Sequence, residues 1–197
     1  MPTIEPEAVA RPQPSLETER LILRLPEPDD ASVLTEQAND AAVVRYTATL
    51  PFPYTFEDAK GWIELSRTSA AKGRDWPYVI VPRDAGAPIG AIGLHARGDA
   101  GEGLVGFWIG QAYWNLGYAS EALAAVLRHG FETAGFEQIA ASVFPENAAS
   151  LRVMARAGFV EVGRGPEPTP ARDQAEHIVA RFVLERASFT DTGTDAR

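Results

Sequence analysis

The sequence predicts one layered domain of the α/β or α+β class, in which helices cover a central sheet. Three strand-like segments, at residues 76–81, 89–95 and 104–109, are separated only by short turns and so predict an antiparallel meander. A long amphipathic helix and a further strand-like segment, at residues 139–143, follow the third strand and complete a strand–helix–strand unit. Elements with one apolar face each are buried by stacking, which gives a layer fold.

The N-terminal third is predicted to contain one strand and two helices. The strand covers residues 21–25. A helix over 28–39 is favoured because its first turn holds a proline and two aspartates, which suit the positive end of the helix dipole. A longer helix is expected over 56–71, because Thr55 and Asp58 resemble a capping box and apolar residues follow at helical spacing.

The helix over residues 119–134 has the clearest pattern in the chain. Its apolar residues recur at i, i+3, i+4, i+7 and onward, which gives a single stripe, and Gly135 is expected to end it. After the strand at 139–143, Asn147 is expected to cap another helix that ends at Gly158.

The two ends of the chain are predicted to be flexible tails. Residues 1–18 are rich in proline and poor in apolar side chains, and residues 188–197 are mostly polar. A final strand is predicted over 178–184, so a single domain should span 19–187.

The composition excludes several classes of protein. The formal net charge of −9 disfavours nucleic acid, which needs clustered Lys and Arg. It would attract cationic amines, although acidity more often only aids solubility. No apolar run approaches the roughly 18 residues of a membrane span, and no secretory signal is evident at the start. The absence of cysteine removes disulfides, thiolate metal sites and a cysteine nucleophile, and fits the cytoplasm. No metal site is expected, because the three histidines lack ligand spacing.

Residues 114–121 are the first candidate for chemistry, because they join a strand to the striped helix. The first N–H groups of a helix have no intrahelical partner and lie at its positive end, so a phosphate or pyrophosphate is the natural ligand. Gly117 and Ala119 have small side chains that let a ligand approach the backbone. A glycine before a helix is more often only a turn, and the sequence signatures of NTPase and dinucleotide loops are absent.

Taken in order and spacing, three groups of residues resemble the GNAT acetyltransferases, and most closely the branch of the ribosomal-protein N-terminal acetyltransferases. They are Phe107-Trp108-Ile109, then Tyr113 to Ala122, then Glu146 to Ser150 with Ala157-Gly158-Phe159. A weaker resemblance extends back through Thr18 to Leu21 and Tyr54 to Ala59. The resemblance covers most of the chain outside the two tails.

The resemblance implies a mixed, mostly antiparallel sheet whose fourth and fifth strands, here 104–109 and 139–143, splay apart around the pantetheine of acetyl-CoA. It assigns the pantetheine and the acetyl carbonyl to main-chain groups of Trp108, Ile109 and Gly110. It assigns the pyrophosphate to the amides of Asn115, Leu116, Gly117, Tyr118, Ala119 and Ser120, the pantetheine arm to Asn147, and the sulfur to Ser150.

The reaction that the resemblance implies is direct attack of a neutral amine on the thioester. A base must take a proton from the ammonium, and an acid must protonate the leaving thiolate. Many relatives carry a tyrosine where this chain has Met154, so Ser150 is expected to be the acid, although it could serve only the helix cap. Relatives often have a glutamate where Leu104 stands, and Glu102 could substitute for it or be a solvated turn residue.

The remaining conspicuous side chains are expected to be structural. Those interpreted as core residues are Trp62, Trp76, Tyr78 and Trp108, whereas His129 is expected to be solvated. His95 and His177 could face the acceptor, and the loops around Tyr46 could set specificity.

The acceptor amine is left open by the sequence. A peptide or protein N-terminus is slightly favoured over a polyamine, an amino acid or an antibiotic. A non-catalytic acyl-CoA sensor and a scaffold without a ligand are the alternatives, because Met154 and Leu104 depart from the family pattern. Dimers are common in such folds, so a homodimer is one expected state that the sequence does not decide.

Overall fold

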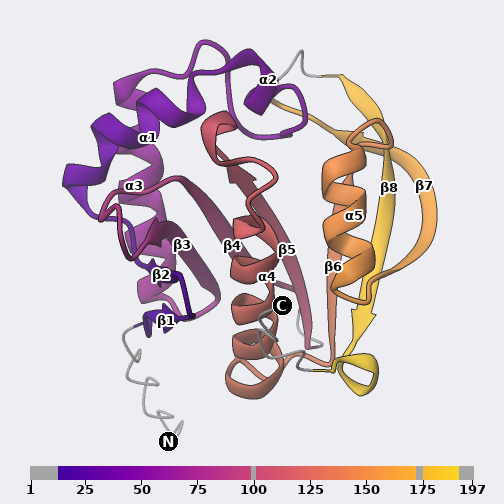
Figure 1. Ribbon diagram of the computed structural model, residues 1–197. Helices are drawn as coiled ribbons and strands as arrows, with labels where there is room; N and C mark the ends of the chain where they lie inside the picture. The colour runs from indigo at the N-terminus through magenta and orange to yellow at the C-terminus, as the bar shows by residue number, and fades with distance from the viewer. Residues whose placement is uncertain (1–12, 99–100, 172–174, 191–197) are drawn as a thin grey trace, which may run out of the picture.

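One sheet organises the computed structural model, which describes residues 13–98, 101–171 and 175–190 (Figure 1). In the described chain the sheet has eight strands in the order β1-β2-β3-β4-β5-β6-β8-β7. All neighbours are antiparallel except β5 and β6, which are parallel. The predicted mixed, mostly antiparallel sheet is therefore confirmed.

The elements have the following bounds. The strands are β1 (Leu16–Glu17), β2 (Leu21–Arg24), β3 (Asp75–Pro82), β4 (Gly90–Arg97), β5 (Glu102–Ile109), β6 (Gln138–Val143), β7 (Val160–Pro168) and β8 (Glu176–Glu185). The helices are α1 (Ala31–Ala38), α2 (Ala41–Val44), α3 (Phe56–Ala71), α4 (Tyr118–Arg128) and α5 (Ala148–Arg156). Single turns lie at Pro28–Asp30, Gln111–Tyr113, His129–Thr133 and Arg186–Ser188.

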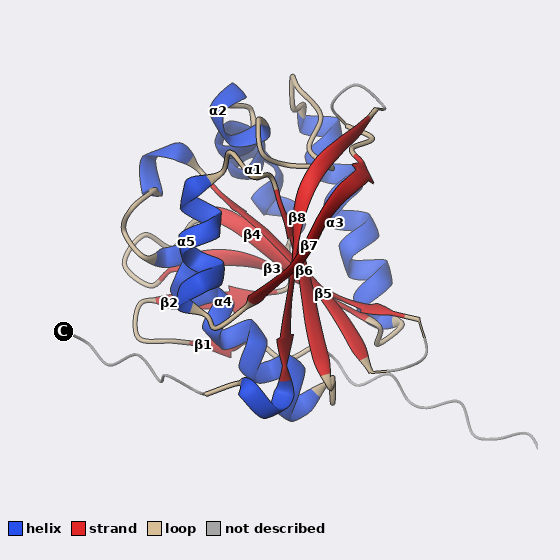
Figure 2. Ribbon diagram, turned by 90° about the vertical axis from the view of Figure 1, so that its right-hand side faces the viewer, coloured by secondary structure: helices blue, strands red, loops and turns tan. Residues whose placement is uncertain are grey.

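Helices cover the sheet from both sides. Helices α4 and α5 lie on one face, and α3 lies on the other (Figure 2). Strand β3 shows the consequence, because Tyr78 and Ile80 belong to the core under α4 whereas Val79 and Val81 belong to the core under α1 and α3. A strand buried on both faces is apolar at successive positions, which explains the unbroken apolar run in the sequence.

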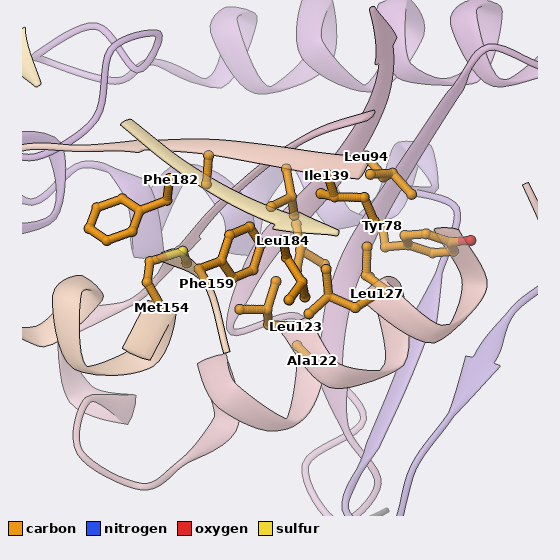
Figure 3. Packing of buried hydrophobic residues seen from close by; sticks show 14 of the residues in the cluster. Tyr78, Leu94, Ala122, Leu123, Leu127, Ile139, Met154, Phe159, Phe182 and Leu184 are labelled. Carbon is orange, nitrogen blue, oxygen red and sulfur yellow. The ribbon is translucent and has the colours of Figure 1, made fainter. Parts of the chain in front are cut away.

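The larger core fills the space between the sheet and the helices α4 and α5. Leu123 and Leu127 of α4 meet Ile139 and Leu184 of the sheet, and Met154 of α5 lies beside Phe159 and Phe182 (Figure 3). All these side chains are buried. The helix stripe predicted from the sequence is therefore the face that α4 buries.

Strands β5 and β6 separate soon after they begin. Their parallel pairing joins Glu102–Leu104 to Gln138–Ala140 and stops there, while β5 continues to Ile109 and β6 to Val143. Each strand stays paired on its other side, to β4 and to β8. The predicted splay of the fourth and fifth strands of the domain is thus present.

The predicted helix caps are present as well. In α3 the Thr55 hydroxyl accepts from the Asp58 N–H at 3.2 Å, and the Asp58 carboxylate accepts from the Thr55 N–H at 2.8 Å. In α5 the Asn147 side-chain oxygen accepts from the Ser150 N–H at 3.1 Å. Gly158 follows α5 with a φ of +85°, a conformation that favours glycine.

The inner ends of the two predicted tails are ordered, which corrects the tail boundaries. Within 1–18, Leu16 and Glu17 form β1 and pair with β2. Within 188–197, Phe189 packs on Phe131 with ring centroids 5.0 Å apart. The other tail residues, 1–12 and 191–197, lie outside the described residues.

Two elements differ from the prediction. Strand β7 is not evident in the sequence, because most of its side chains are exposed and it contains Gly163 and two prolines, so it has no apolar alternation. The stripe predicts a helix to residue 134, but α4 ends at Arg128 and a π-helical turn over His129–Thr133 follows.

His129 is buried, so the prediction that it is solvated is wrong. Its side chain lies edge-on to Trp76 and Tyr78, with ring centroids 5.7 and 6.3 Å apart. Burial lowers the pKa of His129 from its ordinary 6.5, and its Nε2 has no hydrogen-bond partner among the described residues. His129 lies two helical turns after the buried Ala122, and its N–H still donates to the Ala125 carbonyl, so it extends the buried side of α4 beyond the predicted stripe.

The buried His129 should make stability depend on pH. Because its folded pKa is lowered, the unfolded chain binds the proton first as the pH falls below 6.5. The contribution of His129 to the free energy of unfolding should therefore be constant above pH 6.5. Below pH 6.5 the free energy of unfolding should decrease, by at most about 1.4 kcal/mol per pH unit. Denaturant unfolding at a series of pH values measures this slope.

The substitution His129→Phe keeps an aromatic ring in the core and should remove this part of the slope. His95→Gln is the control, because His95 is half-exposed and pairs with Asp75 at 2.8 Å outside the core. A slope below pH 6.5 that is unchanged in His129→Phe would assign the titration to another group.

Candidate functional site

A cavity of about 520 Å³ opens where β5 and β6 diverge. Its walls come from the end of β5, the loop that leads into α4, the first turns of α4 and α5, and α2 with the residues after it. Ligand pockets in proteins have volumes of a few hundred to a thousand Å³, so this cavity can hold a substantial part of a small molecule.

Most of the predicted site residues meet at this cavity. Those that line it are Trp108, Ile109, Asn115, Gly117, Tyr118, Ala119, Ser120, Asn147 and Ser150. Gly110 and Leu116 are not in the lining. The side chain of Leu116 is half-exposed, and its carbonyl accepts from the Arg20 guanidinium at 2.9 Å.

Helix α4 begins at the cavity without a side-chain cap. Its N-cap residue is Gly117, with a φ of +84°, and no side chain accepts from the first turn. Tyr118, Ala119 and Ser120 form that first turn and line the cavity. Their N–H groups have no intrahelical partner and lie at the positive end of the dipole, so the site suits an anion.

The loop before α4 has an unusual backbone. Asn115 has a φ of +61°, and among the described residues it is the only non-glycine residue with a positive φ. The indole N–H of Trp114 donates to the Ile109 carbonyl at 2.7 Å and so ties the loop to the end of β5. Positive φ at Asn115 and Gly117 turns the loop back toward the cavity.

The backbone of β5 presents alternate residues to the splay. The Gly110 N–H donates to the Ile89 carbonyl at 2.8 Å, and Trp108 pairs with Ala91, so these two face β4. Because hydrogen-bonding groups alternate along a strand, the N–H groups of Ile109 and Phe107 face the other way, toward β6. Of the three predicted main-chain groups, those of Ile109 therefore face the open edge, whereas those of Trp108 and Gly110 face β4; their contacts with a ligand stay a prediction.

The first turn of α5 forms the opposite wall. The side-chain oxygen of Asn147 accepts the hydrogen bond that caps α5. The side-chain nitrogen of Asn147 takes no part in this cap. Ser150 is half-buried and lines the cavity. Met154, at the family tyrosine position, is buried in the core instead and does not line it.

Two arginines at the site are not among the predicted site residues. Arg152 and Arg156 are one helical turn apart and line the cavity on the same face of α5 as Ala149 and Val153. Both residues are exposed. Their i, i+4 spacing in a strongly acidic chain is a signal that could have identified them.

The wall formed by α2 is a further addition to the predicted site. Ala42 and Val43 of α2 line the cavity together with Tyr46 and Thr47. Tyr46 lies 6.4 Å from Phe144 between ring centroids, which brings the loop after α2 to the end of β6. Tyr46 therefore lines the cavity, and a role on the acceptor side stays a prediction.

Three other candidates lie away from the cavity. Glu102 is at the opposite end of β5 from Ile109, seven residues or about 23 Å along the strand, and does not line the cavity. His95 pairs with Asp75, and His177 contacts the Thr169 hydroxyl at 2.7 Å through Nδ1. No cluster of metal-binding side chains was found among the described residues.

None of the helices in the described ranges is long and apolar enough to cross a membrane.

Comparison with known proteins identifies the family. Residues 20–160 match the family described as acetyltransferase (GNAT) domain. The chain is 33% identical over 151 residues to the uncharacterized N-acetyltransferase YoaA of Bacillus subtilis (strain 168), over 76% of this chain and 85% of that protein.

Solved structures share the fold. The acetyltransferase (GNAT family) from Bacillus anthracis superposes with a TM-score of 0.76 at 25% identity, over 88% of this chain and 99% of that chain. Mycobacterium smegmatis RimJ in complex with CoA-disulfide gives a TM-score of 0.77 at 22% identity, over 88% of each chain. The residues that match the family include every residue that lines the cavity, and the chain belongs to the GNAT family of N-acetyltransferases.

Proposed function

We propose that this acetyltransferase takes its acetyl group from acetyl-CoA and transfers it to a primary amine by direct attack on the thioester. The observation that carries the proposal is the continuous surface from the unpaired edge of β5 to the uncapped start of α4. An extended polar chain with a diphosphate at one end matches that surface: the strand edge can pair with amides and the helix start can bind the diphosphate.

The cavity fits the charge of acetyl-CoA as well as its shape. The chain carries a net charge of −9, yet Arg152 and Arg156 place two positive charges on the cavity wall. Such local positive charge is what phosphate groups require. In M. smegmatis RimJ, a CoA-disulfide is bound within the same fold, which supports the assignment.

The residues can be given roles in the transfer. Acetyl-CoA supplies the activated acetyl group when it is bound. The N–H of Ile109 or Phe107 can donate to the acetyl carbonyl oxygen, where negative charge develops during attack. Ser150 on the facing helix is the proposed proton donor to the leaving sulfur. No cysteine exists to form a covalent acetyl-enzyme.

The acceptor is proposed to be the α-amine of a peptide or protein, as in the branch that the sequence resembles. It would reach the thioester beside Tyr46 and Thr47, which form the wall after α2. Polyamines, amino acids and antibiotic amines are the other arms of an acceptor screen. A cytoplasmic location stays a prediction from the sequence.

Binding of acetyl-CoA is the first test. At about a hundred times its dissociation constant a ligand stabilises the native state by about 2.7 kcal/mol, which is several degrees in Tm for a chain of this size. Gly117→Ala should weaken this shift strongly, because the new side chain strains the αL conformation at the start of α4 and lies 3.2 Å from the Arg20 guanidinium that contacts the loop.

Gly135→Ala is the matched control for Gly117→Ala. Gly135 has a φ of +81° beyond the other end of the same helix, and a Cβ added there would meet nothing within 4 Å. Both variants should lose similar stability, but only Gly117→Ala should lose the shift. No shift in the wild-type protein with acetyl-CoA or other acyl-CoAs would refute the proposed function.

Arg152→Ala and Arg156→Ala should each weaken acetyl-CoA binding roughly tenfold, because each removes a charge-assisted contact to phosphate. The loss should shrink as salt is raised, since both residues are exposed. Arg97→Ala at the far end of β4 is the control. Titration calorimetry at two salt concentrations measures the effect, and equal affinities in all variants would contradict it.

Ser150→Ala should lower kcat by on the order of a hundredfold and change acetyl-CoA affinity little, because the hydroxyl acts as a general acid only during transfer. Thiol release with the best amine from the screen measures kcat. Ser120→Ala is the control, since Ser120 lines the same cavity but is proposed to act through its backbone. An unchanged kcat in Ser150→Ala would leave Ser150 only its place in the helix cap.

A further inference from the structure

A buried carboxylate lies at the helix start that is proposed to bind the pyrophosphate. Glu121 is in the first turn of α4, and only 7% of its surface is exposed. A negative charge in that turn favours the isolated helix, but it opposes a negatively charged ligand at the same helix end. Something must offset this charge for the site to bind an anion.

Arg20 supplies the compensating charge. Its guanidinium contacts the Glu121 carboxylate through Nε at 2.7 Å and through Nη2 at 2.6 Å. Its own backbone N–H also donates to Glu121, at 2.9 Å. Both guanidinium contacts go to Oε2 and the backbone N–H goes to Oε1, so Arg20 contacts both oxygens of the Glu121 carboxylate with charge-assisted interactions.

The same guanidinium also holds the loop before α4. Its Nη1 donates to the Leu116 carbonyl at 2.9 Å, and its Cζ lies 4.8 Å from the centroid of the Tyr118 ring. A Cβ placed on Gly117 would lie 3.2 Å from Nη2. Arg20 thus lies directly against the three residues 116–118, which bracket the start of α4.

Thr18 completes the arrangement. Its hydroxyl donates to Glu121 at 2.6 Å. Burial alone would raise the pKa of Glu121, but the hydrogen bonds from Thr18 and Arg20 outweigh burial and lower the pKa. Glu121 is therefore ionised, and its charge is matched by Arg20.

We infer that Arg20 is a positioning residue for the acetyl-CoA site: it neutralises Glu121 and fixes the loop whose amides face the pyrophosphate. The inference rests on the proposed function, because it concerns the same ligand. It gives the turn between β1 and β2 a role at a site about a hundred residues away in the sequence. A lysine could supply the charge. It lacks the planar guanidinium whose separate nitrogens contact Glu121 and Leu116 at the same time.

The test compares two ligands, of which only one carries the phosphates and the adenosine of coenzyme A. Acetyl-CoA and S-acetylpantetheine share the thioester arm, but S-acetylpantetheine carries no phosphate. Arg20→Ala should weaken acetyl-CoA binding by roughly tenfold to thirtyfold and change S-acetylpantetheine binding less than about twofold. Arg20→Lys should fall between wild type and Arg20→Ala. Calorimetry on the full chain, after circular dichroism has shown that each variant is folded, measures both affinities.

A double variant separates charge from structure. In Arg20→Ala with Glu121→Gln the unmatched charge is gone, so most of the lost acetyl-CoA affinity should return. This variant also covers the case in which Arg20→Ala alone does not fold, because it leaves no buried unpaired carboxylate. Arg83→Ala is the matched control, because Arg83 contacts Glu17 at 2.7 Å and the Thr18 carbonyl at 3.0 Å but not the loop.

Two results would overturn the inference about Arg20 and leave the proposed function standing. One is an Arg20→Ala protein that binds acetyl-CoA as the wild type does. The other is a variant that loses affinity for both ligands equally without recovery in the double variant, which would make Arg20 a purely structural residue. A wild-type protein that binds neither ligand would instead overturn the proposed function, and this inference with it.

Discussion

The separation of β5 from β6 after three paired residues is the constraint on which the rest of the structure depends. Backbone N–H and C=O groups rarely stay unpaired in a fold, and a sheet that opens at its centre leaves a row of them. The remaining ladders, β4 with β5 and β6 with β8, keep both strands in place while the edge between them stays open. Because the alternation of β5 turns Ile109 and Phe107 toward that edge, the sheet itself creates a groove that accepts an extended polar ligand. The cavity lies beside the open end of β5, between that strand and the start of α5, which follows β6.

Two helices begin at the opening, and their starts differ in a way that separates their roles. Helix α5 is closed by Asn147, which satisfies the Ser150 N–H, so its first turn offers side chains to the cavity. Helix α4 has Gly117 at its N-cap and no side-chain cap, so its first turn offers backbone N–H groups. A glycine is the weaker cap for stability, and its use here is consistent with an anion completing the helix start. The loop is held from outside instead, by Arg20 at Leu116 and by Trp114 at Ile109.

Local patterns in the sequence predict the elements and residues whose properties are local. The capped helix α3, the cap at Asn147 and the stripe of α4 each depend on neighbours within a few residues, and each is found as predicted. Strand β7 is not predictable from apolar alternation, because its side chains are mostly exposed and its pairing with β8 supplies the order. His129 is buried because α4 packs on the core over a wider arc than its apolar stripe, an arc that includes the small residues Ala122 and Ala125 on the side of His129. The contacts of Arg20 with Leu116 and Glu121 span about a hundred residues, so only the folded chain brings them together.

The net charge of the protein is distributed unevenly between its surface and the cavity. A net charge of −9 attracts cationic amines over the molecule as a whole, and by itself would repel an anionic cosubstrate. The cavity reverses the sign locally. Arg152 and Arg156 on its wall outnumber the one lining carboxylate, Glu146, the positive end of α4 lies on another wall, and Glu121 beneath it is matched by Arg20. Salt screens fields over about 10 Å, so the local positive groups decide what binds in the cavity while the acidic surface acts on what approaches the protein. The proposed transfer joins an anionic donor to a cationic acceptor, and the separation of the two fields in space lets one small domain attract both.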